Sequence, residues 1–135
     1  MRKKANKALQ ESEERFLSIF NNMDVGITLL DLNGHIIRTN ELYCDFLGFS
    51  REEIVGMHFS KFTYEEDLDK DIELFDALVK GERSGYDLEK RHVRKDGKIV
   101  WGRLRASLVR DDDGHPKYAF FTCVDVTERK LTEEA

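Results

Sequence analysis

Residues 86–126, YDLEKRHVRKDGKIVWGRLRASLVRDDDGHPKYAFFTCVDV, decide the fold of this chain. Apolar and polar side chains tend to alternate here with a period of two, which is typical of β-strands. Asp96-Gly97 and Asp113-Gly114 divide the stretch, and Asp-Gly between two strand-like runs is a strong hairpin signal. The stretch therefore predicts three long strands that are joined as two antiparallel hairpins.

A further hairpin is predicted nearer the N-terminus. The runs VGITLLD (25–31) and HIIRT (35–39) are short, apolar and β-prone, and Asn33-Gly34 lies between them. The region between this hairpin and Gly85 has the pattern of helices instead, because candidate caps precede runs with apolar residues on one face. The caps are Asn40 before residues 41–48, Ser50 with Glu53, and Thr63 with Glu66 before a helix that runs to about residue 80.

This order of elements predicts the fold class. Two strands, several helices and three strands follow one another, and one helical crossover is the only connection between strands that is not a hairpin. We therefore expect an α+β domain with a five-stranded antiparallel sheet and with its helices gathered on one face.

An amphipathic helix is predicted before the domain, over residues 3–23. Its apolar positions recur every seven residues in two sets offset by four, which are Leu9, Phe16 and Met23, and Ala5, Ser12 and Ile19. Such a stripe fits a helix that packs on its own domain, and it also fits the seam of a homodimer. Both interpretations stay open from the sequence.

Composition limits the class of protein. The chain has 135 residues, enough for one compact domain, and its formal net charge of −5 argues against general nucleic-acid binding. The two cysteines, Cys44 and Cys123, lie far apart in apolar surroundings, which fits a reducing cytosol better than a disulfide framework. No segment is apolar enough to span a bilayer. We therefore expect a cytoplasmic domain; the cytosolic part of a membrane-bound sensor would show the same pattern.

These motifs, taken in order, resemble the PAS domain family over about residues 12–128. The resemblance is carried by ESEERFLSIFNNM (11–23), GITLLDLNGHIIRTNELYCDFLGFSREEIVGM (26–57) and RKDGKIVWGRLRASLVRDDDGHPKYAFFTCVDVTERK (94–130). It implies a sensory or dimerising module of a longer signalling chain, such as a histidine kinase or a diguanylate cyclase. It also implies three segments, which are an N-terminal helix (1–23), a sensory domain (24–127) and the start of a signalling helix (128–135).

The last residues, DVTERKLTEEA (125–135), contain the signals of a helix start. Asp125 and Thr127 are both good N-cap residues, and Glu128 follows Asp125 by three positions. The resemblance implies that this Asp-x-Thr exit transmits a change from the sheet to an effector domain in the same chain. Asp125, Thr127, Glu128 and Arg129 are therefore the candidate transmission residues.

No catalytic constellation is found in the sequence, so we expect the isolated domain not to be an enzyme. No histidine has zinc-site spacing to another ligand, and we predict no metal site. By the resemblance, light-sensing members carry Asn-Cys-Arg where this chain has His58-Phe59-Ser60, which argues against a covalent flavin. Haem-binding members use a histidine on the long helix, and residues 64–80 contain none. No cofactor is predicted.

A small-molecule pocket is the remaining candidate site. Alternation places Tyr86, Leu88 and His92 on one face of their strand, and the resemblance directs the matching faces of the next strands towards the helices. The alternative is that the same phenylalanines fill a solid core. The candidate pocket residues are His92, Phe46, Phe59, Phe62, Phe75, Gly102, Leu104, Phe121 and Cys123.

An apolar strip is predicted on the outer face of the sheet. Ile99, Trp101 and Val109 alternate with the core positions, so they need a cover, which the N-terminal helix or a partner subunit would supply. The basic run KRHVRKDGK (90–98) is interpreted as lysines and arginines on the solvent side of the sheet rather than as a nucleic-acid site. The residues expected in a homodimer or sheet cover are Leu9, Phe16, Ile19, Phe20, Ile99, Trp101 and Val109.

The leading hypothesis is a sensory and dimerising module that binds a small ligand or a partner and reports it through the exit helix. One rival is a purely structural dimerisation domain with a filled core. Another is a small α+β enzyme with His92 as a base, for which the sequence offers no matching acid.

Overall fold

The computed structural model describes residues 2–22 and 24–134, and these residues form a five-stranded antiparallel sheet with helices. The elements are α1 (Arg2–Asn22), β1 (Gly26–Leu30), β2 (Ile36–Thr39), α2 (Glu41–Leu47), α3 (Arg51–Ile54), the 3-10 helix η1 (Phe59–Phe62), α4 (Glu65–Val79), β3 (Gly85–Val93), β4 (Ile99–Arg110), β5 (Pro116–Asp125) and α5 (Thr127–Glu134). The predicted α+β class is confirmed.

The sheet has the strand order β2-β1-β5-β4-β3. All three predicted hairpins are present as antiparallel pairs, β1 with β2, β3 with β4 and β4 with β5. At the tip of the last hairpin, Gly114 has a φ of +83°, a conformation that glycine adopts without strain. β1 also pairs with β5, so the first strand of the chain lies antiparallel to the last one in the middle of the sheet.

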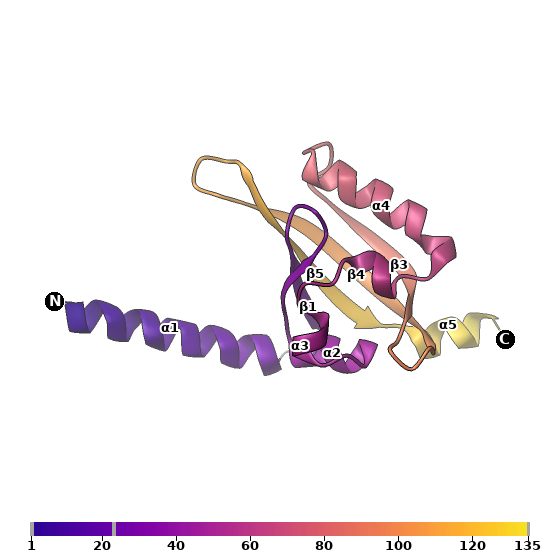
Figure 1. Cartoon of the computed structure of the whole chain (residues 1–135), viewed down its shortest axis with the longest axis horizontal. Helices are drawn as coiled ribbons and strands as arrows, with labels where there is room; N and C mark the ends of the chain where they lie inside the picture. Colours follow the sequence, from indigo (N-terminus) through magenta and orange to yellow (C-terminus); the bar gives the residue numbers. More distant parts are fainter. Residues whose placement is uncertain (1, 23, 135) are drawn as a thin grey trace.

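The core lies between one face of the sheet and the helices α2, α3, η1 and α4. This arrangement confirms the predicted one-sided layer, and Figure 1 shows α4 running along the sheet, while α2 and α3 lie below it in the view. The inward-facing residues of β4 and β5 are buried, among them Leu104, Ala106 and Phe121. The Asp-Gly hairpins thus position a continuous apolar face opposite the helices.

Asn40 performs more than the predicted capping of α2. Its Oδ1 accepts hydrogen bonds from the backbone N–H of Tyr43 (3.1 Å) and of Ile27 (2.9 Å). Its Nδ2 donates to the carbonyls of Phe20 and Val25, both at 2.9 Å. The side chain is fully buried, so it ties the end of α1, the first strand and α2 together. The predicted capping box of Ser50 with Glu53 is also present.

The predicted capping box of Thr63 with Glu66 is wrong. α4 starts after Tyr64, which makes no side-chain capping bond, rather than after Thr63. The Thr63 hydroxyl instead donates to the carbonyl of Phe59 (2.7 Å) and accepts from the Lys90 ammonium (2.8 Å). A hydrogen bond to a charged donor is stronger than a neutral cap, and it directs this hydroxyl into the core.

The N-terminal helix does not cover the sheet of its own chain, contrary to one of the two expectations. In Figure 1, α1 extends away from the domain as a rod. Phe20 in its last turn is buried and stacks on Phe16, and the Arg38 guanidinium lies over both rings. Leu9 and Ile19, by contrast, are 60% and 62% exposed. The predicted stripe member Met23 and the side chain of Ala5 lie outside the described residues.

Candidate functional site

A small cavity of about 20 Å³ lies between the sheet and the helices. Five of the nine predicted pocket residues line it, Phe59, Phe62, Phe75, Leu104 and Phe121, together with Thr28, Leu30, Tyr43, Asp71 and Lys90. A cavity of this size accommodates about one water-sized group. The phenylalanines therefore largely fill the core, as the alternative interpretation of the pocket expected.

Lys90 is the residue that the sequence interpretation misplaced. Its side chain points into the core, where only 2% is exposed, and its ammonium forms an ion pair with the Asp71 carboxylate, which is 3% exposed. The ammonium also donates to Thr63, as described above, and lies 5.4 Å from the centre of the Phe59 ring. The solvent-side interpretation of the run 90–98 is therefore wrong for Lys90.

The signal that could have placed Lys90 was present in the sequence. The alternation that set Tyr86 and His92 on the inner face also includes position 90. Alternation therefore predicts a buried Lys90. A lysine is almost never fully buried unless it is paired, and the strand itself offers no partner. Its partner Asp71 lies on α4, nineteen positions away.

His92 is fully buried, and neither ring nitrogen has a hydrogen-bond partner among the described residues. Burial lowers the pKa of His92 well below its usual value, and the Lys90 charge acts in the same direction, so the imidazole is neutral. A Cβ atom on Gly102 would lie 2.7 Å from His92 Cε1 and 2.8 Å from Cys123 Sγ. These three predicted pocket residues thus pack together, but His92 and Gly102 do not line the cavity.

The two remaining predicted pocket residues line a different, more open space. Phe46 and Cys123 lie in a groove of about 420 Å³ between α2 and the ends of β1 and β5. Its wall also includes Tyr43, which faces the inner cavity as well. Burial raises the pKa of the Cys123 thiol to about 12, so this cysteine is an inert apolar wall at neutral pH. The Tyr43 side chain therefore separates this groove from the small inner cavity.

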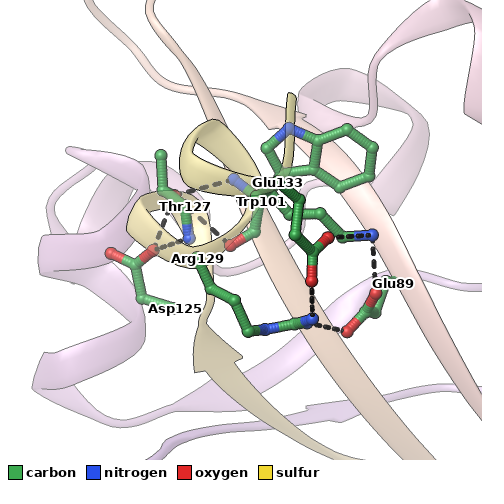
Figure 2. Close-up of polar contacts among 7 residues, drawn as sticks. Glu89, Trp101, Asp125, Thr127, Arg129 and Glu133 are labelled. Atoms are coloured by element: carbon green, nitrogen blue, oxygen red, sulfur yellow. Dashed lines mark hydrogen bonds and ion pairs between the residues drawn. The ribbon is translucent and has the colours of Figure 1, made fainter. Parts of the chain in front are cut away.

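The exit from the sheet is a hydrogen-bonded joint (Figure 2). Asp125 Oδ1 accepts from the backbone N–H of Thr127 (3.0 Å) and from its hydroxyl (2.6 Å). The Thr127 hydroxyl oxygen in turn accepts from the backbone N–H of Trp101 (2.9 Å). Asp125 therefore holds the N–H of the first residue of α5, and Thr127 fastens the helix to β4. Glu128 lies exposed in the first turn.

Charged side chains hold α5 against the outer face of the sheet. Glu89 on β3 forms ion pairs with Arg129 and with Lys130, the latter at 2.9 Å, and Figure 2 shows the contact with Arg129. These cations lower the pKa of the Glu89 carboxyl, with the Lys130 hydrogen bond contributing most, so it is ionised at neutral pH. Arg129 also pairs with Glu133 at 2.7 Å. Glu89, Arg129 and Lys130 are called the exit clasp below.

The predicted outer strip is covered in part, and by a helix that the sequence did not suggest. The Lys130 ammonium lies 5.0 Å from the centre of the Trp101 ring, and the Arg91 guanidinium lies 5.3 Å from it. Val109 is half-buried, whereas Ile99 remains 42% exposed. The exit helix is therefore the cover of Trp101 within one chain.

Two further features bear on cofactors and metals. Phe59 is buried and packs against the Phe75 ring, while the Ser60 hydroxyl lies 2.9 Å from His58 Nδ1. Exposed groups in the β4–β5 turn, namely Asp111, Asp113 and His115, have ligand atoms within 4.8 Å of one another. Asp111 Oδ1 already accepts the backbone N–H groups of Asp113 and His115, so its carboxylate holds the turn.

The five-stranded antiparallel sheet with its helices on one face is the fold seen in solved structures of PAS domains. The profile of the PAS domain family matches residues 24–128, so the chain belongs to the PAS domain family. The crystal structure of the PAS domain of a protein from Colwellia psychrerythraea superposes with a TM-score of 0.78 at 22% identity, covering 86% of this chain and 98% of that one.

Curated relatives are large signalling proteins. The probable diguanylate cyclase DgcE of Escherichia coli (strain K12) is 38% identical over 128 residues, which are 95% of this chain and 12% of that protein. The sensor histidine kinase TmoS of Ectopseudomonas mendocina is 22% identical over 130 residues, which are 96% of this chain and 13% of that protein. The chain thus corresponds to about an eighth of the length of either relative. PAS domains are sensory modules and are not themselves catalytic. Within the described ranges, no helix is both long and apolar enough to cross a membrane.

Proposed function

We propose that this domain senses a small ligand or a partner and passes the change through Asp125 and Thr127 into an effector domain of a longer chain. The exit joint is the observation that carries the proposal. Thr127 connects α5 directly to the backbone of β4, and the exit clasp connects it to β3. A shift of either strand therefore changes the direction in which α5 leaves the domain.

The sensory step is a shift between populations of two sheet arrangements. A ligand or partner shifts these populations only if it binds the two arrangements with different affinities. The effector is proposed to be a kinase or a diguanylate cyclase, which the relatives support. The domain would work in the cytoplasm, in agreement with its two free, buried cysteines, and without a covalent flavin or haem.

Homodimerisation is part of the proposal. The exposed side of α1 carries Leu9, Phe16 and Ile19, which are 60%, 46% and 62% exposed. Apolar residues repeated along one helix face are typical of a helix that pairs with another helix. A second candidate function, a dimerisation domain without a ligand, is favoured by the small volume of the inner cavity.

A fusion protein tests the transmission role. Residues 1–135 are joined in register to a diguanylate cyclase, and its output is compared between the native α1 and the variant Ile19→Glu, which is designed to weaken dimerisation. The double variant Asp125→Ala/Thr127→Ala is expected to abolish the difference in output. Its stability should fall by only about 0.5–1.5 kcal/mol for each lost hydrogen bond.

The matched control is Thr132→Ala. This threonine also lies on α5, but its hydroxyl donates only to the carbonyl of Glu128 within the same helix. It should leave the regulated output intact. If the double variant loses regulation only in proportion to its loss of folded protein, Asp125 and Thr127 are structural and the proposed transmission role is wrong.

A further inference from the structure

Four polar groups face the small cavity inside an otherwise apolar core. They are the side chains of Thr28, Tyr43, Asp71 and Lys90, and the remaining wall consists of phenylalanine and leucine side chains. Ligand sites commonly combine apolar walls with a few polar groups that orient the ligand. The kind of ligand that this cavity accepts follows from the charges and hydrogen-bonding capacity of the four groups. This inference rests on the ligand-binding part of the proposed function.

The charges in the cavity wall already cancel. Lys90 and Asp71 form a contact ion pair, and both side chains are almost completely buried. A ligand with a net charge would leave one buried charge without a counterion, and such a charge is strongly unfavourable in an apolar interior. The group that enters the cavity must therefore be neutral.

The hydrogen-bonding capacity requires a group that both donates and accepts. The Lys90 ammonium has three N–H donors, of which Asp71 Oδ2 and Thr63 Oγ1 occupy two. The bond from Lys90 goes to Oδ2 of Asp71, and a carboxylate has a second acceptor oxygen, here Oδ1. A hydroxyl group can donate to Asp71 Oδ1 and accept from Lys90 with one oxygen atom, which fits a cavity of about 20 Å³.

We propose that the domain binds neutral hydroxylated compounds, alcohols or phenols, with the hydroxyl between Lys90 and Asp71. The body of such a compound extends past Tyr43, because this ring separates the cavity from the groove of about 420 Å³. Tyr43 packs closely on Gly26, where an added Cβ would lie 3.0 Å from its ring. Rotation of Tyr43 into the groove joins the two spaces. The groove is lined by apolar side chains, including Leu42, Phe46 and Val124, and by the charged residues Asp24, Asp45, Arg94 and Asp125.

Four probes of similar size test the inference on the whole chain: phenol, toluene, benzoate and benzylammonium. Binding is followed by NMR titration of backbone amides, at up to about 10 mM so that dissociation constants near 1 mM are measured. Phenol is expected to bind at least tenfold more tightly than the other three, with shifts at Phe59 and Phe121. In the variant Lys90→Met/Asp71→Leu, which replaces the ion pair by apolar side chains, toluene should bind more tightly than phenol.

Each other result overturns the inference in a recognisable way. If benzoate or benzylammonium binds as tightly as phenol, the neutral-ligand argument is wrong while ligand binding by the domain stands. If phenol and toluene bind equally to the native chain, the ion pair does not select the ligand. If none of the four probes binds, the cavity does not take this class of ligand, and the transmission role is still judged separately by the cyclase fusion.

Discussion

Removal of Lys90 alone should destabilise the domain far more than removal of the whole Lys90–Asp71 pair. In Lys90→Met the Asp71 carboxylate stays in a core where it is 3% exposed, without its ammonium partner. Breaking a buried pair in this way costs about 3–5 kcal/mol. Domains of this size are stable by roughly 5–15 kcal/mol, so the loss is a large share of the total.

The double variant Lys90→Met/Asp71→Leu should recover most of this loss. Both charges are removed, and apolar side chains of similar volume take their places among phenylalanines. Replacement of a whole buried ion pair by apolar residues is often neutral or stabilising by about 1–4 kcal/mol. The two positions are therefore strongly coupled, and a double-mutant cycle measures the coupling energy.

The assay is urea unfolding at neutral pH, monitored by far-ultraviolet circular dichroism. A matched control is the ion pair between Arg105 on β4 and Asp87 on β3, whose side chains are 74% and 51% exposed. Removing one partner of such an exposed pair should cost less than about 1 kcal/mol, so Arg105→Met serves as the reference. If Lys90→Met costs no more than Arg105→Met, Lys90 is solvated and its assignment to the core is wrong.

Three further results are expected. Leu9→Glu/Ile19→Glu should convert a dimer into a monomer, as measured by light scattering, without lowering the melting temperature. The control Gln10→Glu adds one charge away from the apolar stripe and should leave the dimer intact. An unchanged mass for Leu9→Glu/Ile19→Glu would exclude α1 as the dimer contact. Freshly purified, untagged protein should show no absorption band near 400–450 nm, a region where a bound flavin or haem absorbs, and such a band would contradict the prediction made from Phe59 and residues 64–80. Neighbouring cations lower the pKa of Glu89. The stabilisation of α5 by the ionised Glu89 carboxylate is therefore complete above the usual glutamate pKa of 4.5, and it is lost as the pH falls through the lowered pKa. The protection factors of the α5 amides, which compare each exchange rate with that of an unstructured peptide at the same pH, should therefore fall at acidic pH in the native chain and be low at neutral pH in Glu89→Gln. Equal protection factors for the two proteins at neutral pH would show that the exit clasp does not hold the helix.

The local parts of the fold could be predicted because their causes are local. A hairpin follows from Asn-Gly or Asp-Gly between two strand-like runs, and all three predicted hairpins are present. The capping of α2 by Asn40 and the box of Ser50 with Glu53 depend on residues three positions apart. The apolar face of β4 follows from alternation alone. Leu104 on β4 and Phe121 on β5 both line the inner cavity.

Predictions failed where a residue's partner lies far away in the chain. Thr63 has the spacing of a capping residue, but Lys90, twenty-seven positions later, binds its hydroxyl instead. Trp101 was expected beneath the N-terminal helix or a partner subunit, yet within one chain Lys130 from the exit helix lies on its ring. No pattern within a strand or helix contains these distant partners.

The sequence by itself determined the strands, the hairpins, most helix starts and the side of each strand that faces the core, because turn conformation, capping and alternation act over a few neighbouring residues. Only the tertiary structure decided that β1 lies beside β5, that Lys90 is neutralised by Asp71 inside the core, and that Glu89 fastens the exit helix. These last contacts join residues nineteen and forty positions apart. A buried charge is stable only where the fold delivers its counterion, so the position of Lys90 depends on how α4 packs against β3.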